Sequence, residues 1–86
     1  MKTVTTSSGF TAELDETRLN DMELFEDLMA LDSGKTIVLP AVVGRIMGEN
    51  KKRLYDHLRA ENGTVPIEKV TAEVMEIINL LGAKNS

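Results

Sequence analysis

A run of mostly apolar residues in the middle of the chain restricts the possible fold more than any other feature. It covers residues 36–48, and Arg45 is its only charged residue. A run with so many large apolar side chains and a single charge is expected to form a helix buried on nearly all sides. These side chains include those of Leu39, Val42, Val43, Ile46 and Met47. The sequence therefore predicts a central buried helix, too short to cross a bilayer, which takes about 20 apolar residues.

The length of the chain limits the core that can form around this helix. Its 86 residues make one domain, close to the size below which small domains need additional support, so homo-oligomerisation stays open. The absence of Cys excludes disulfides and thiolate metal sites. The N-terminus has no apolar run of the kind found in signal peptides, and no segment could span a membrane. We therefore expect a cytoplasmic protein with no membrane partner.

A β-hairpin and three further helices are predicted around the central helix. Residues 1–14 alternate apolar and polar side chains on either side of Ser8 and Gly9, which predicts a hairpin that turns there. Capping residues, glycines and prolines predict helices at 20–32, 38–47, 49–61 and 66–81, with a frayed tail at 83–86. We expect a mainly α (α+β) fold over residues 1–86, in which the hairpin precedes a compact four-helix domain.

Boundary residues indicate where these helices begin and end. Asn20 is expected to cap the first helix, and Gly34 to end it with a positive φ. Pro40 is expected in the first turn of the second helix, where its missing N–H costs nothing, and Gly48 at its end.

The apolar stripes predict which side chains are buried. We expect Glu68, Glu73 and Glu76 of the last helix to face water. The predicted core consists of Leu24, Leu28, Val42, Val43, Ile46, Leu54, Leu58, Val74, Ile77 and Leu81, and Phe10 and Leu14 of the hairpin should pack on the helices.

Charge is distributed unevenly along the chain. Residues 13–32 contain eight acidic residues and one Arg, whereas residues 35–59 contain six basic and two acidic residues. The simplest interpretation is that oppositely charged helices face solvent and stabilise each other within one bundle. The alternative is head-to-tail or partner docking by charge complementarity. Nucleic acid is not an expected partner, because the net charge is −4 and the basic segment holds one aromatic residue, Tyr55.

The helix predicted at 20–32 has more apolar surface than one core contact needs. Its six large apolar residues cover about 180° of the helix, whereas one core-facing stripe takes about 100°. Met22, Phe25 and Met29 form the surplus edge, and unbranched Met adapts to varied apolar partners. This edge is a candidate protein-binding surface, with Ile78 and Leu81 of the last helix as further candidates. The alternative is that the edge belongs to the ordinary core.

The sequence contains no recognisable catalytic or metal-binding pattern. Residues 33–36 resemble the end of a P-loop, but Met29 stands where the first Gly is needed and lies in a predicted helix. His57 is the only His and there is no Cys, so a structural zinc site cannot assemble. No Ser has a recognisable nucleophile context. We therefore expect no enzymatic activity, no metal and no cofactor.

Several segments together carry a resemblance to a known group of proteins. They are the turn at Ser8-Gly9-Phe10, the acidic helix after Asp15, the Leu39-Pro40 step, the segment 48–58 (GENKKRLYDHL) and Gly63-Thr64-Val65. Over nearly its whole length the chain resembles the small proteins encoded in the tail modules of siphophages and prophages of Gram-positive bacteria, among them the tail assembly chaperones.

The resemblance implies a function but no catalytic residues. It implies a non-enzymatic protein of the host cell cytoplasm that binds the long, helical tape-measure protein, keeps it soluble, and helps tail-tube subunits polymerise around it. Two other classes stay open. A small structural or adaptor component of a phage tail or virion should assemble into rings. A DNA-linked regulator would need a basic recognition helix, for which residues 49–61 are the only candidate.

Overall fold

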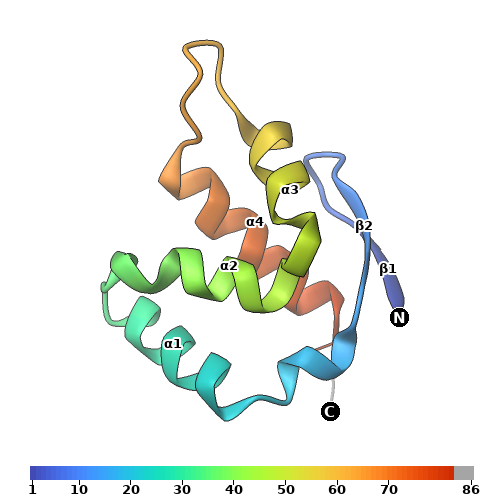
Figure 1. Ribbon diagram of the computed structural model, residues 1–86, viewed down its shortest axis with the longest axis vertical. Helices are drawn as coiled ribbons and strands as arrows, with labels where there is room; N and C mark the ends of the chain where they lie inside the picture. The colour runs from blue at the N-terminus through green and yellow to red at the C-terminus, as the bar shows by residue number, and fades with distance from the viewer. Residues whose placement is uncertain (83–86) are drawn as a thin grey trace.

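The fold is arranged around α2 (Leu39–Met47), the helix that the apolar run predicts. In the computed structural model, which describes residues 1–82, α2 crosses the middle of the molecule, with α1 on one side and α3 on the other (Figure 1). The elements are β1 (Lys2–Thr5), β2 (Thr11–Leu14), α1 (Met22–Asp32), α2, α3 (Lys51–Leu58) and α4 (Ile67–Leu80). The predicted mainly α fold with an N-terminal hairpin is therefore confirmed. The predicted frayed tail lies outside the described residues.

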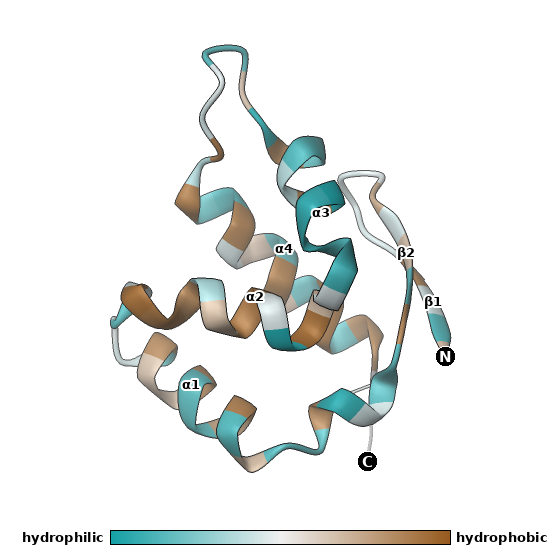
Figure 2. Cartoon of the chain, viewed as in Figure 1, coloured by the Kyte–Doolittle hydropathy of each residue, from teal (hydrophilic) through white to brown (hydrophobic). Residues whose placement is uncertain are grey.

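The central helix has the predicted boundaries, but it is buried on one face rather than on nearly all sides. At about 100° per residue its buried side chains lie within about 140° of one another, and Pro40 and Ala41 are exposed. Pro40 lies in its first turn, and Gly48 ends it with a φ of 54°. All five of its large apolar side chains are buried, and Figure 2 shows brown segments along this helix that alternate with pale and teal ones. Because α2 contacts several other elements, it forms the centre of the hydrophobic core.

The other elements each contribute one apolar face to the same core. The predicted core residues are buried, except that Leu28 is only half-buried and packs at the core's margin. The predicted packing of Phe10 and Leu14 and the predicted burial of Leu39 and Met47 are confirmed as well. The core further includes Val4, Ala12, Val70 and Ile78.

The hairpin is antiparallel and packs on the helices with one face. Lys2 pairs with Leu14 and Thr5 with Thr11, and Gly9 turns the chain with a φ of 91°. On the face that packs on the helices Val4, Ala12 and Leu14 are buried, whereas Lys2 at the open end of the hairpin is exposed. An isolated two-stranded hairpin is only marginally stable in water, so its packing on the helices holds it in place.

Two predicted helix boundaries are wrong. The cap of α1 is Asp21, whose Oδ1 accepts a hydrogen bond from the Glu23 N–H at 2.9 Å, whereas Asn20 ends a preceding 3₁₀ turn. The third helix ends at Leu58 rather than at residue 61, because the following residues form their own hydrogen-bonded turn. In that turn the Ala60 N–H donates to the Thr64 carbonyl at 2.8 Å. Within residues 1–82 no helix is both long enough and apolar enough to cross a membrane.

Candidate protein-binding surfaces

The surplus apolar edge of α1 is exposed. Met22, Phe25 and Met29 have 68%, 56% and 59% of their surface exposed to solvent. On the opposite side of the helix, Leu24 is buried and Leu28 is half-buried against the core. The prediction that one edge of this helix is left over is confirmed, and the alternative that the edge belongs to the core is wrong. Whether the edge binds a protein stays a prediction.

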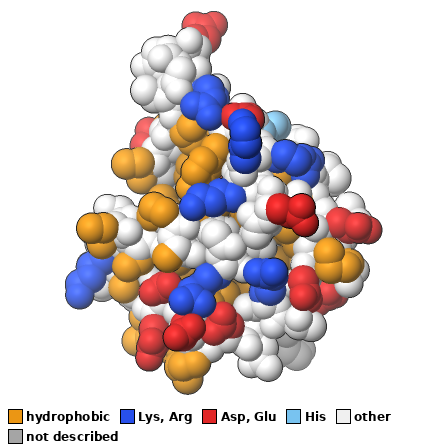
Figure 3. Space-filling model, in the orientation of Figure 1, with side chains coloured by type: hydrophobic (Ala, Val, Ile, Leu, Met, Phe, Trp, Pro, Cys, Tyr) orange, Lys and Arg blue, Asp and Glu red, His pale blue; other side chains and the backbone are white. Residues whose placement is uncertain are grey.

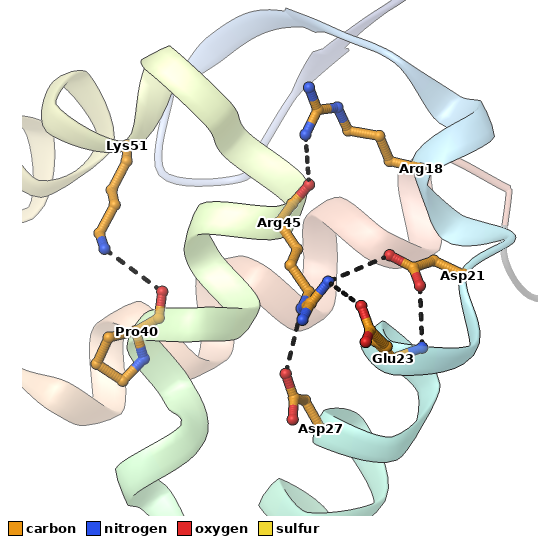
Figure 4. Close-up of polar contacts among 7 residues, drawn as sticks. All are labelled: Arg18, Asp21, Glu23, Asp27, Pro40, Arg45 and Lys51. Atoms are coloured by element: carbon orange, nitrogen blue, oxygen red, sulfur yellow. Dashed lines mark hydrogen bonds and ion pairs between the residues drawn. The ribbon is translucent and has the colours of Figure 1, made fainter.

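Arg45 of α2 fixes the orientation of α1. Its Nη1 lies 3.5 Å from an Asp21 carboxylate oxygen and 3.3 Å from a Glu23 carboxylate oxygen, and its Nε lies 3.3 Å from Asp27 (Figure 4). Arg18 donates a hydrogen bond to the Arg45 carbonyl at 3.0 Å. Each partly exposed ion pair contributes at most about 1 kcal/mol, but three on one guanidinium restrict how α1 can rotate. Among the described residues Arg45 is the only base that pairs with α1, and the basic residues of and after α3 form no ion pair with it. The interpretation that oppositely charged helices stabilise each other is therefore confirmed for the contact of α1 with α2 alone.

Acidic residues border the exposed edge of α1 on both sides. At about 100° per residue, Met22, Phe25 and Met29 lie within about 60° of one another, with Glu26 beside Met22 and Asp32 beside Phe25. Glu26 and Asp32 are exposed, and neither forms an ion pair within residues 1–82. These five residues, which we call the α1 edge, form an apolar strip between two free carboxylates.

The other two predicted binding residues do not belong to a surface. Ile78 and Leu81 are only 6% and 5% exposed. They lie on the apolar stripe of α4 that packs into the core, and Ile78 shares a small hollow with Leu28 of α1. The prediction that they contribute to binding is therefore wrong. Met75 is instead one of the exposed apolar side chains of α4.

A second apolar surface, which the sequence did not indicate, is a groove of about 590 Å³. Its walls come from the segment before α2 and the start of that helix, from α3, and from the start of α4. Ile37 and Ile67, which are 87% and 60% exposed, belong to its lining together with Leu39, Pro40, Tyr55 and Val65. Burial raises the pKa of the Tyr55 phenol. Figure 3 shows orange side chains gathered here, with blue basic side chains beside them.

The tip of the hairpin is fastened to α4 by a buried carboxylate. Glu73, predicted to face water, is only 5% exposed. The buried Thr6 hydroxyl donates to its Oε2 at 2.5 Å, and the Ser8 hydroxyl lies 2.9 and 3.0 Å from its two oxygens. Nearby, Glu76 accepts from the N–H and the hydroxyl of Ser7 at 2.7 and 2.9 Å. The prediction for Glu73 is wrong because the hairpin covers it and supplies its hydrogen bonds.

The His57 ring lies beside this cluster but not in the order of a nucleophile relay. In such a relay the imidazole stands between the hydroxyl and the carboxylate and takes the hydroxyl proton. Here the Ser8 hydroxyl lies between the imidazole and the carboxylate, and it donates its hydrogen bond to Glu73. The His57 Nε2 lies 3.1 Å from both the hydroxyl and the carbonyl oxygen of Ser8. Because a carbonyl only accepts, Nε2 carries the proton and donates it. The cluster therefore joins α3, α4 and the hairpin.

The remaining sequence features point to no ligand chemistry in the part of the chain that the structure describes. Residues 1–82 hold no group of three His, Asp or Glu side chains placed to bind a metal. Met29 lies within α1 and Gly34 follows that helix with a φ of 100°, so the backbone nest of a P-loop is not formed here. Comparisons with protein-family models, curated proteins and solved structures found no match to the chain.

Proposed function

We propose that this chain is a non-enzymatic tail assembly chaperone-like protein of a phage or prophage, and that it binds the tape-measure protein through the α1 edge in the host cell cytoplasm. The observation that carries the proposal is that Met22, Phe25 and Met29 are exposed along one edge of α1. The overall pattern of the sequence, with its resemblance to small tail-module proteins, supplies the identity of the partner.

The chemistry of the α1 edge suits a long helical partner of varied sequence. An amphipathic helix can lay its apolar face along such a strip, with contacts repeated every three or four residues. Met side chains are unbranched and flexible, so they adapt to different apolar partners. Glu26 and Asp32 keep the strip hydrated when it is unoccupied, and they favour partner helices with flanking basic residues.

The size of the edge predicts weak binding at each individual site. Full burial of one such side chain contributes about 1.5–3 kcal/mol, and the three are already partly covered, so the gross gain is about 3–5 kcal/mol before the entropic cost of association. A long tape-measure protein offers many such helical segments. Several copies of the chain can therefore bind along one client and cover its apolar surface.

The alternative is a small structural or adaptor component of a phage tail or virion. The groove beside Ile37 and Ile67 favours it, because a chain with two separate apolar surfaces can join two neighbours. Such a component assembles into rings by itself and remains in the finished particle. A chaperone, in contrast, binds the client and is absent from the particle.

The test is co-expression with the tape-measure protein encoded in the same tail module. The wild-type chain should co-purify with it and raise its soluble fraction. The double variant Phe25→Ala with Met29→Ser should do so less well while melting at nearly the same temperature, because both side chains are exposed. Met75→Ser is the matched control, since Met75 is also an exposed Met but lies on α4.

The outcomes distinguish an error in the proposed chaperone function from an error in the choice of binding surface. If the wild-type chain neither co-purifies with the tape-measure protein nor improves its solubility, the chaperone function is wrong. If the double variant performs as well as the wild type, the client binds elsewhere. Finding the chain in purified mature tails would favour the structural alternative.

A further inference from the structure

We propose that the groove binds the α1 edge of a second copy of the same chain. The groove is the hollow of about 590 Å³ between the start of α2, α3 and the start of α4. Its volume lies in the range of pockets that enclose groups of several side chains' size, and its lining is mainly apolar. The strip of Met22, Phe25 and Met29 is an exposed apolar surface that such a lining can cover.

The rim of the groove carries positive charge that the chain itself does not neutralise. Lys51 lies with its Nζ 5.7 Å from the centre of the Tyr55 ring and 3.4 Å from the Pro40 carbonyl oxygen. No carboxylate pairs with Lys51 or with the exposed Lys35 among the described residues. Arg59 also lines the groove, but Asp56 pairs with it at 2.9 Å. Within residues 1–82 the groove thus has one unpaired ammonium group, that of Lys51, against its apolar lining, and a second unpaired lysine, Lys35, directly precedes the lining residues Thr36 and Ile37 in the chain.

The α1 edge has the opposite arrangement. Its apolar strip lies between the free carboxylates of Glu26 and Asp32, so an edge in the groove brings carboxylates to a basic rim. Contact between two edges, or between two grooves, would instead bring like charges together, which costs free energy. Charge therefore selects edge-to-groove contact over the two like-to-like contacts.

The contact must be made between molecules. Within one chain the α1 edge faces solvent and is held away from the core by the ion pairs of Arg45. Edge and groove are different surfaces, so the interface is heterologous: each copy offers one of each. This inference does not depend on the proposed function, since no client takes part. If a client does bind the edge, it competes with the second copy.

The first experiment is sedimentation velocity of the purified full-length chain over a range of concentrations. The wild type should associate reversibly. An edge variant, Phe25→Ala with Met29→Ser, and a groove variant, Ile67→Ser, should each associate at least about tenfold more weakly, as expected for central apolar contacts. The control Met75→Ser should associate like the wild type.

Mixing the two variants gives the decisive result. The edge variant keeps an intact groove and the groove variant keeps an intact edge, so their equimolar mixture should form a one-to-one complex that neither variant forms alone. The proposal is overturned if the wild type stays monomeric at millimolar concentration, if neither variant weakens association, or if the mixture behaves as the sum of its parts.

Charge reversal provides an independent version of this test with side chains outside the buried core. One variant carries Glu26→Lys with Asp32→Lys, and the other carries Lys35→Glu with Lys51→Glu. Each should fail to self-associate, because its edge and groove then have the same sign. Their mixture should associate, because the unchanged edge of the second variant meets the unchanged groove of the first, and the two reversed surfaces also have opposite signs. Association of either variant alone at the wild-type level, or failure of the mixture to associate, would contradict the inference.

Discussion

Replacing Glu73 by Ala should destabilise the protein far more than replacing another Glu of the same helix. Glu73 is buried, and it accepts hydrogen bonds from the hydroxyls of Thr6 and Ser8, which hold the tip of the hairpin on α4. The substitution removes the acceptor and leaves the Thr6 hydroxyl in a buried position. The hairpin then depends on its apolar face alone.

The magnitude follows from these two hydrogen bonds. A hydrogen bond to a charged group contributes about 1.5–3 kcal/mol, so about 3–6 kcal/mol of interaction is lost. Part of this loss is offset, because a buried carboxylate no longer has to be desolvated, and because the Thr6 hydroxyl retains the Ser8 hydroxyl at 3.1 Å as a partner. We expect a net loss of about 2–3 kcal/mol, out of the roughly 4–13 kcal/mol typical of a domain of this length.

The assay is urea unfolding together with thermal melting. A loss of 2–3 kcal/mol corresponds to a decrease of about 8–24 °C in melting temperature for a chain of this size. Glu68→Ala is the matched control, because Glu68 is exposed on the same helix, and it should change stability by no more than about 0.5 kcal/mol. The stability of Glu73→Gln should lie between those of Glu73→Ala and Glu68→Ala, since the amide oxygen still accepts one hydrogen bond.

Hydrogen exchange locates the effect. In the Glu73→Ala variant the amide of Thr6, which donates to the Phe10 carbonyl in the hairpin turn, should exchange faster relative to the amides of α2. If Glu73→Ala were as stable as Glu68→Ala, the assignment of Glu73 as the fastening of the hairpin would be wrong.

Two further predictions concern the core and the response to acid. Val43→Asp should lower the free energy of unfolding by several kcal/mol, because Val43 is fully buried and the new carboxylate has no partner; Ala41→Asp on the exposed side of α2 is the control, and equal urea midpoints for the two variants would contradict the core assignment. Hydrogen bonds from Arg59 and then Lys52 hold the pKa of Asp56 below its ordinary value of 3.8, so its stabilising contribution is complete above pH 3.8 and is lost as the pH falls through the lower folded-state pKa. The gap in melting temperature between wild type and Asp56→Asn should therefore narrow below about pH 4, and a gap that stays constant down to pH 2 would refute this assignment.

Local sequence signals determined the main helices and the hairpin turn. Residues 36–48 predicted the central helix of the core because the run carries many large apolar side chains and one charge, and Pro40 and Gly48 marked its ends through their backbone preferences. The α1 edge was predicted for a similar reason, since the helix had more apolar surface than one contact can bury. Periodicity and capping act within a few residues, so the sequence displays them directly.

The cap of α1 and the end of α3 show the limit of these local signals. Asn20 and Asp21 are both good caps, and only the backbone geometry after the preceding 3₁₀ turn decided between them. The third helix stops at Leu58 because the turn closed by Ala60 and Thr64 competes with another helical turn. Both choices depend on small free-energy differences between neighbouring conformations.

Only the tertiary structure decided the environment of Glu73 and of Ile67. Glu73 lies about 40° from Ile77 on the helix, at the margin of the apolar stripe, so the helix alone allows it to face either water or the core. It is buried because Thr6, 67 residues away in the sequence, supplies a hydrogen bond. Likewise, Ile67 lines a groove because chain segments from three helices meet there. Periodicity reports how one element is divided between apolar and polar faces, whereas the partners of each face depend on which distant segments fold against it.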